Sequence, residues 1–179
     1  LGTANRREYF VRPVMKRQDI LSVIKCASEA DNKRDLSILL LIAVTGLRCC
    51  DISSLRMEDI EWKNHYISLI QQKTNAHVSI PVSKKVLDVL ADYIINERPE
   101  SQFPQVFLSA RNPGRPISTS AVYSLLCRRL KRAGIKKISG DGRSPHGMRR
   151  SLATAMVSSG AEVAIVSQIL GHRSMNSAR

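Results

Sequence analysis

The sequence predicts a mainly helical domain of the α+β class that contains one small antiparallel β-sheet. Three observations support this prediction. Apolar residues recur at helical spacing in most of the chain, the stretch after Trp62 alternates as strands do, and Gly and Ser residues stand at the expected helix ends. With 179 residues and 43% hydrophobic content, the chain is long enough for one compact core.

The first half of the chain contains the signals of three helices. Residues 15–30 have apolar side chains at helical spacing, and the apolar run 36–44 predicts a buried second helix. Asp31 or Asp35 is expected to cap this second helix, and Gly46 suits the left-handed residue that ends it. Residues 49–60 predict a shorter third helix.

From Trp62 onwards the pattern changes to strands and then returns to helix. Residues 65–72 and 76–83 are rich in alternating β-branched residues and are joined by a turn-like segment, which predicts a β-hairpin. Residues 83–98 again show helical spacing, and residues 105–110 are a candidate third strand.

A helix over residues 119–133 is predicted between a capping Ser118 and Gly134. Its expected apolar face consists of Val122, Leu125, Leu126 and Leu130. The expected opposite side carries Arg128, Arg129, Lys131 and Arg132. This basic run is either an ordinary solvated face or a contact surface for backbone phosphates, and the sequence leaves both interpretations open.

The segment "SPHGMRR" at residues 144–150 predicts another helix start, with Ser144 as the cap and Pro145 in the first turn. This helix is expected to end near Gly160, and a last short helix is expected over residues 162–170. The expected buried stripe of the first of these helices consists of Met148, Leu152, Ala155 and Met156.

His146 and Arg149 lie three residues apart on this helix and therefore share a face near its N-terminus. A helix N-terminus already carries a partial positive charge and free N–H groups, so further cations there are unfavourable unless an anion binds. Either the arginines point into water or an anion binds here, and a phosphate would satisfy all of these donors.

The charge of the chain also points to a polyanion. The sequence has 28 Lys and Arg against 15 Asp and Glu, for a net charge of +13, and residues 103–179 hold 13 of the basic residues but only two of the acidic ones. Contacts to phosphate supply most non-specific affinity for nucleic acids. Because aromatic residues make up only 4% of the chain, duplex DNA is a better candidate than stacked single strands.

Cysteine usage and hydropathy exclude several classes of protein. The four cysteines show no metal-like spacing, which favours reduced thiols in an intracellular protein. No apolar run approaches the roughly 20 residues that span a bilayer, and residues 1–10 lack the apolar region of a signal peptide. Clustered carboxylates with ligand spacing and a Gly-rich phosphate loop are also missing from the sequence, so we expect no metal and no cofactor.

Four motifs occur together in a characteristic order: "TGLRCCDISSL", a lysine in a β-turn, "HGMRRSLATAMVSSGA" and "ILGH". In this order and at these intervals they resemble the catalytic domain of the tyrosine recombinase (phage-type integrase) family, from about residue 13 to the end. The resemblance implies that Arg48 and Arg149 grip the scissile phosphate and that Lys73 is the general acid. It also implies acid/base work by His146, a hydrogen bond to phosphate from His172, and support of Arg48 by Asp51.

The nucleophile is the departure from the family pattern. The resemblance places a tyrosine about nine residues beyond His172, near position 181, whereas the sequence ends at Arg179 and none of Tyr9, Tyr66, Tyr93 and Tyr123 matches. We therefore expect residues 13–179 to be a catalytic domain truncated before its tyrosine. Residues 1–12, which are rich in Arg and polar groups, are expected to be a linker or entry segment. The family's N-terminal DNA-clamping domain is expected to be absent.

The resemblance implies site-specific recombination of double-stranded DNA through a 3′-phosphotyrosyl intermediate, without metal or ATP. It further implies a homotetramer on DNA for the full-length protein, with a monomer plausible for these residues alone, and a place in the prokaryotic cytoplasm or nucleoid. The DNA contacts are expected from Arg128, Arg129, Lys131, Arg132 and Arg150. The alternatives are a type IB topoisomerase, a catalytically silent duplex-DNA-binding module and a plain basic helical regulator.

Overall fold

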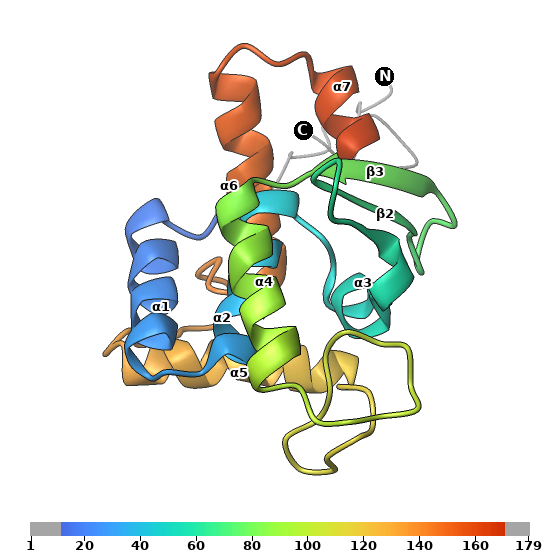
Figure 1. The fold of residues 1–179 in the computed structure, drawn as a ribbon. Coiled ribbons are helices and arrows are strands. Elements are labelled where there is room, and N and C mark those ends of the chain that lie inside the picture. Colours follow the sequence, from blue (N-terminus) through green and yellow to red (C-terminus); the bar gives the residue numbers. More distant parts are fainter. Residues whose placement is uncertain (1–11, 171–179) are drawn as a thin grey trace, which may run out of the picture.

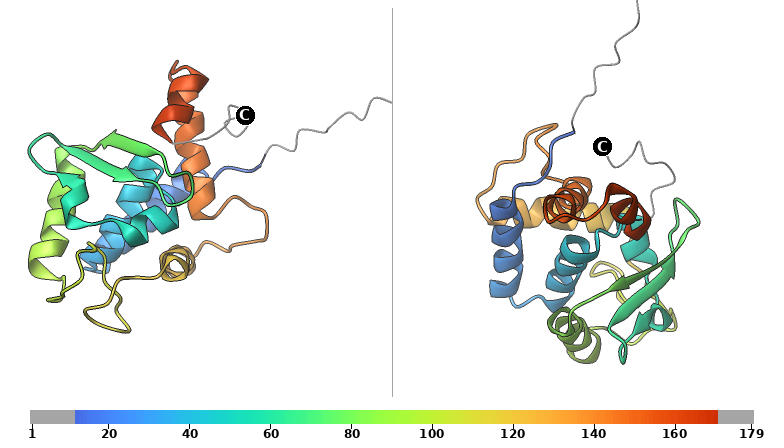
Figure 2. Two further views of the ribbon diagram at one scale, coloured as in Figure 1. Left: turned by 90° about the vertical axis from the view of Figure 1, so that its right-hand side faces the viewer. Right: turned by 90° about the horizontal axis from the view of Figure 1, so that it is seen from above.

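Helix α2 (Lys33–Thr45) runs through the middle of the protein, and five other helices pack against it. Helix α1 and the sheet lie on opposite sides of α2 (Figures 1 and 2). The computed structural model describes residues 12–170. The remaining elements in chain order are α1 (Arg17–Glu29), α3 (Cys49–Ser54), the 3₁₀ helix η1 (Met57–Asp59), β1 (Ile60–Glu61), β2 (Tyr66–Ile70), β3 (His77–Pro81), α4 (Lys84–Asn96), α5 (Thr119–Arg132), α6 (Pro145–Ser158) and α7 (Val163–Ile169).

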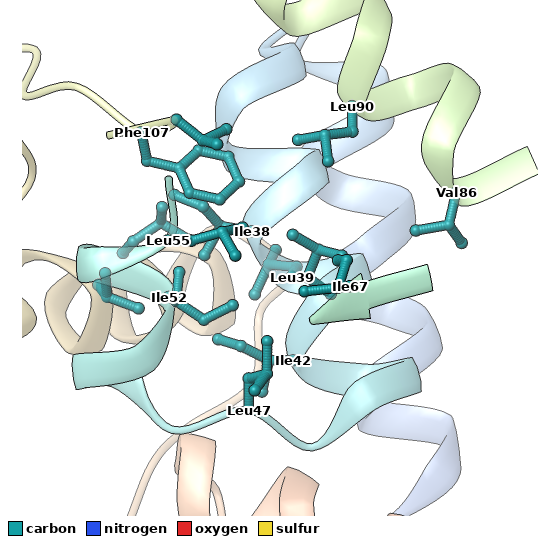
Figure 3. Close-up of a cluster of buried hydrophobic side chains, with 14 of the residues drawn as sticks. Ile38, Leu39, Ile42, Leu47, Ile52, Leu55, Ile67, Val86, Leu90 and Phe107 are labelled. Atoms are coloured by element: carbon teal, nitrogen blue, oxygen red, sulfur yellow. The ribbon is translucent and has the colours of Figure 1, made fainter. Parts of the chain in front are cut away.

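Helix α2 is central because its sequence is apolar nearly all round. Ile38, Leu39 and Ile42 are fully buried in the core shown in Figure 3. The helix is capped by Asn32, whose side chain accepts a hydrogen bond from the Asp35 backbone N–H at 2.8 Å. The expectation that Asp31 or Asp35 would provide this cap is wrong, because the Asp35 carboxylate binds arginines instead.

The sheet is antiparallel with the strand order β1-β2-β3, and its hairpin confirms the prediction for residues 65–83. Buried and exposed side chains alternate along β2 and β3, so that Ile67 pairs with Ile80 on the face that packs on the core. Two predictions near the sheet are wrong. Residues 49–60 form α3, η1 and β1 instead of one helix, and the third strand is β1 instead of residues 105–110.

Residues 105–110 differ from a strand because they are fixed by side chains. The Arg98 guanidinium donates to the carbonyl oxygens of Phe103, Gln105 and Val106, and the Phe107 ring stacks on Tyr93 with centroids 5.6 Å apart. These contacts hold the segment against the core. Backbone strand pairing in this segment is limited to isolated bridges at residues 105 and 108.

The predicted apolar face of α5 is confirmed, but one of the basic residues expected on its solvent side is buried. Arg129 is only 2% exposed, and its Nη2 lies 2.8 Å from Oδ2 of the buried Asp35 on α2. The expectation that Arg129 lies on the solvent side is therefore wrong. Position 129 follows Leu125 and Leu126 by four and three residues, which places it within the apolar stripe.

Helix α6 begins as predicted, because the Ser144 side chain caps it and Pro145 occupies its first turn. The expected buried stripe is correct only for Met148. Leu152 and Met156 are partly buried and Ala155 is exposed. The second half of α6 extends beyond the body of the protein, where it meets α7 (Figure 1).

The buried pair of Asp35 and Arg129 predicts a large effect on stability. We expect Arg129→Ala to lower the free energy of unfolding by about 3–5 kcal/mol, because it leaves a buried carboxylate with less compensation. Arg128→Ala is the matched control on the exposed side of the same helix, and its effect should stay within about 0.5 kcal/mol. Urea unfolding of both variants measures the difference, and similar values for the two would contradict the assignment.

Candidate active site

Arg149 lies on the second turn of α6 and is buried, with 6% exposure. Its Nη1 donates to the Gly46 carbonyl and its Nη2 donates to the Leu170 carbonyl. These carbonyls stand at the C-terminal ends of α2 and α7, where a helix carries partial negative charge. Two helix ends therefore hold the guanidinium in one orientation.

Gly46 permits this close arrangement. It adopts the left-handed conformation, with φ 64°, that ends α2. A Cβ at this position would lie 2.8 Å from the Leu170 side chain and 3.4 Å from Cγ of Arg149. A larger residue would therefore press against the side chains of Leu170 and Arg149.

Arg48 directly precedes α3, and its guanidinium also enters the interior. Its Nη1 donates to Oε1 of Gln71 at 2.7 Å, and its backbone N–H donates to the fully buried Asp51 at 3.2 Å. The second oxygen of Asp51 accepts the backbone N–H of Gln72 at 3.0 Å. Asp51 therefore connects the start of α3 with the hairpin, 3.9 Å from the Arg48 guanidinium.

Gln71 brings the two arginines into one hydrogen-bond network. Its Nε2 donates at 3.3 Å to the Leu170 carbonyl, the same oxygen that accepts from Arg149. Sequence reasoning missed Gln71, although a signal was present. Residue 71 continues the inward-facing alternation of Ile67 and Leu69.

Positive charge surrounds His146 on the first turn of α6. Burial is the first cause that lowers the pKa of this imidazole, followed by the charges of Arg150, Arg149, Lys73 and Arg48. Lys73 is exposed in the turn of the hairpin. The structure thus brings together four of the five sequence-predicted catalytic residues. His172, the fifth, lies outside the described residues.

Burial and the neighbouring charge of Arg48 lower the pKa of Arg149 to about 10, although Asp51 opposes the shift. At neutral pH this guanidinium is still protonated, because its pKa lies well above 7. The site therefore retains the positive charge of both arginines.

A cavity of about 570 Å³ opens beside His146. It is lined by Cys49, Ser118, Thr119, Ser120, Tyr123, Pro145 and His146, which come from the starts of α3, α5 and α6. Burial, followed by the neighbouring Cys50, raises the pKa of the Cys49 thiol to about 11. This thiol is therefore protonated at neutral pH and is a poor nucleophile.

The remaining predicted DNA contacts fall into two groups. Arg128, Lys131 and Arg132 are exposed on α5, whereas Arg129 is buried and cannot reach a ligand from outside. Arg150 is partly exposed, and its Nε and Nη2 donate to the Pro13 carbonyl at 3.0 and 2.6 Å. Arg150 therefore fixes the N-terminal segment against α6, and its charge also lowers the pKa of His146.

The described part of the chain offers neither a metal centre nor a membrane-spanning helix. Residues 12–170 contain no group of three or more His, Cys, Asp and Glu side chains that could hold a metal ion. None of the helices described is both long and apolar enough to cross a membrane.

Comparison with known proteins identifies close matches to this chain and its fold. The family model described as "Phage integrase family" matches residues 13–179. The chain is 32% identical over 167 residues to the integrase/recombinase y4gC of Sinorhizobium fredii, which covers 92% of this chain and 85% of that protein.

The fold is also found in solved structures, among them two recombinases. The XerA recombinase gives a TM-score of 0.79 at 23% identity, over 92% of this chain and 57% of the other. The XerH site-specific recombinase, solved with its palindromic difH substrate as a post-cleavage complex, gives 0.77 at 18% identity, over 94% and 48%. The chain therefore spans only about half of either solved chain.

The charges around His146 predict the direction in which its pKa is shifted. We expect its pKa to lie below the usual 6.5, so that the imidazole is mostly neutral at neutral pH. Lys73→Ala should raise this pKa, because it removes one of the positive charges that disfavour protonation. NMR titration of the imidazole C–H signal measures this change, with Lys131→Ala on the exposed side of α5 as control. A pKa that does not respond to Lys73→Ala would separate the hairpin lysine from His146.

Proposed function

Since this chain belongs to the phage integrase family, we propose that the protein that contains it is a tyrosine recombinase, which cuts and rejoins duplex DNA at specific sites. One observation carries the proposal. The buried guanidinium of Arg149 and the partly buried one of Arg48 share a hydrogen-bond network beside a histidine on which four positive charges act. The name of the Sinorhizobium relative and the DNA complex of XerH agree with it.

The two arginines are suited to bind the non-bridging oxygens of a phosphodiester. A guanidinium has five N–H donors in a rigid plane, and the Gly46 and Leu170 carbonyls take two of those on Arg149. We assign the others to phosphate. Negative charge on these oxygens grows in the transition state, and each preorganised donor of this kind is worth about 10²–10³ in rate.

The covalent step that we propose uses a tyrosine beyond Arg179. Its phenol oxygen attacks phosphorus, the bond from phosphorus to the 5′-oxygen breaks, and a 3′-phosphotyrosyl link forms. His146 is suited to accept the phenol proton, because its lowered pKa keeps it neutral. Lys73 gives a proton to the leaving 5′-oxygen, and His172 donates a hydrogen bond to the phosphate. A 5′-hydroxyl of another strand reverses the step.

We assign the DNA contacts outside the active site to the exposed residues of α5. Arg128, Lys131 and Arg132 lie on its solvent side and supply positive charge for backbone phosphates. On DNA the complete protein would assemble as a homotetramer, whereas residues 1–179 alone would be monomeric. We place this reaction in the prokaryotic cytoplasm, without metal or nucleotide.

Two alternatives are less well supported. A type IB topoisomerase would relax supercoiled DNA without exchanging strands, and a silent DNA-binding module would form no covalent link. The names of the relatives favour recombination over both. Supercoil relaxation without strand exchange by the complete protein would favour the topoisomerase.

The first test is covalent trapping. On nicked suicide DNA, the protein extended through the proposed tyrosine should form an adduct that denaturing gels detect. Arg149→Ala should slow its formation at least about 100-fold, because it removes a preorganised donor to the phosphate. Arg149→Lys retains charge near the carbonyls of Gly46 and Leu170 and should also be slow, because it loses the planar fork.

Arg111→Ala, at an exposed loop position, serves as the control and should react as the wild type does. Thermal unfolding shows whether each variant is folded. Adduct formation at the normal rate by a folded Arg149→Ala variant would remove this arginine from the proposed role.

The second test concerns the DNA surface and needs only residues 1–179. Each of Arg128→Ala, Lys131→Ala and Arg132→Ala should reduce the slope of log K against log salt by about 1, because one phosphate contact is lost. Lys25→Ala, on the exposed surface of α1, is the matched control and should leave the slope unchanged. Equal slopes for all four variants in fluorescence anisotropy titrations would place the DNA on another face.

A further inference from the structure

Gln71 is a buried polar residue that the proposed chemistry does not use. It follows β2 directly and is 1% exposed. Polar side chains are seldom this deeply buried, and those that are need hydrogen-bond partners. The hydrogen-bond partners of Gln71 therefore indicate its role in the site.

The amide of Gln71 contacts three functional parts of the site. Its Oε1 accepts from Arg48 Nη1 at 2.7 Å and from the Thr74 hydroxyl at 3.0 Å, and its Nε2 donates to the Leu170 carbonyl. Thr74 is the neighbour of Lys73 in the hairpin turn. The Leu170 carbonyl is shared with Arg149, so one side chain joins both arginines and the turn that carries the lysine.

Backbone contacts fix Gln71 itself. Its N–H donates to the Ala76 carbonyl at 2.9 Å, and its carbonyl accepts the Asn75 N–H at 2.9 Å. These bonds close the base of the turn that holds Lys73. The position of the amide therefore follows the position of the hairpin, and any displacement of the hairpin changes the contact with Arg48.

We propose that Gln71 is a positioning residue that holds Arg48, Arg149 and the Lys73 turn in register on one phosphate. This inference rests on the proposed function. Two guanidinium groups in one buried region repel each other, so fixed acceptors are needed to keep them together before an anion arrives. Gln71 supplies an acceptor to one arginine and a donor to the carbonyl that holds the other.

The neutral amide also explains why a glutamine suits this position better than a glutamate. A carboxylate would still accept from Arg48, but it would neutralise positive charge that the phosphate needs. It would also place an oxygen against the Leu170 carbonyl in place of the Nε2 donor. The amide fixes the positions of the arginines, and because it is neutral it does not reduce the positive charge that attracts the phosphate.

The experiment measures the single-turnover rate of adduct formation on nicked suicide DNA at saturating concentration. It uses the protein extended through the proposed tyrosine. Gln71→Met preserves length and removes both hydrogen-bonding groups, whereas Gln71→Glu preserves the acceptor and removes the donor. We expect each to slow the reaction at least 10-fold, with the Kd of Gln71→Met for intact DNA within about threefold of wild type.

A control and a double variant separate positioning from a purely structural role. Gln102→Met makes the same chemical change at an exposed loop position and should react at the wild-type rate. The rate losses of Arg48→Ala and Gln71→Met should combine to less than their product, because the part of the Gln71 effect that acts through Arg48 is already lost in Arg48→Ala. Thermal unfolding identifies any variant that does not fold, and Gln71→Glu is the closest in shape to the wild type.

The outcomes separate the two proposals. Wild-type rates in a folded Gln71→Met or Gln71→Glu variant would overturn the inference while the proposed function stands. The inference is also overturned if the defect of Gln71→Met lies in the Kd alone, or if its effect multiplies with that of Arg48→Ala. A wild-type protein that forms no adduct would overturn the proposed function, and this inference with it.

Discussion

The guanidinium groups of Arg48 and Arg149 carry like charges and lie in one region of the protein. Their hydrogen bonds go mainly to neutral oxygen atoms. Burying a cation is costly, and a second cation nearby adds to the cost, as the lowered pKa of Arg149 shows. The Gly46 and Leu170 carbonyls and the Gln71 amide offset this cost with partial charges. Because Asp51 is the nearby carboxylate for two arginines, the site keeps an excess of positive charge that an anion can neutralise.

The fold supplies these acceptors at its helix ends. Helix α2 ends at Gly46 and α7 ends beside Leu170, so their carbonyls meet at the side chain of Arg149. Helices α3 and α6 begin at the same region, and the hairpin brings Gln71 to it. The site is therefore built from distant parts of the chain, and its geometry depends on the packing of the core around α2 (Figure 3).

The basic residues have distinct tasks that the net charge of the chain does not separate. Arg129 neutralises Asp35 in the interior, and Arg143 joins Asp19 on α1 to the loop before α6 at 2.8 Å. Arg150 holds the N-terminal segment at Pro13. These three residues make contacts within the protein, whereas the exposed cations of α5 and the Arg48–Arg149 region are among the groups that can meet a polyanion.

The sequence by itself determined the features that depend on residues a few positions apart. The Ser144 cap, the Gly46 helix end, the hairpin and the family motifs were all predictable, because each follows from local spacing. Tertiary structure alone decided that Arg129 meets Asp35, 94 residues away, that Gln71 joins the arginines, and that the second half of α6 leaves the core. These contacts depend on which helices and strands pack together, and no local pattern encodes that choice.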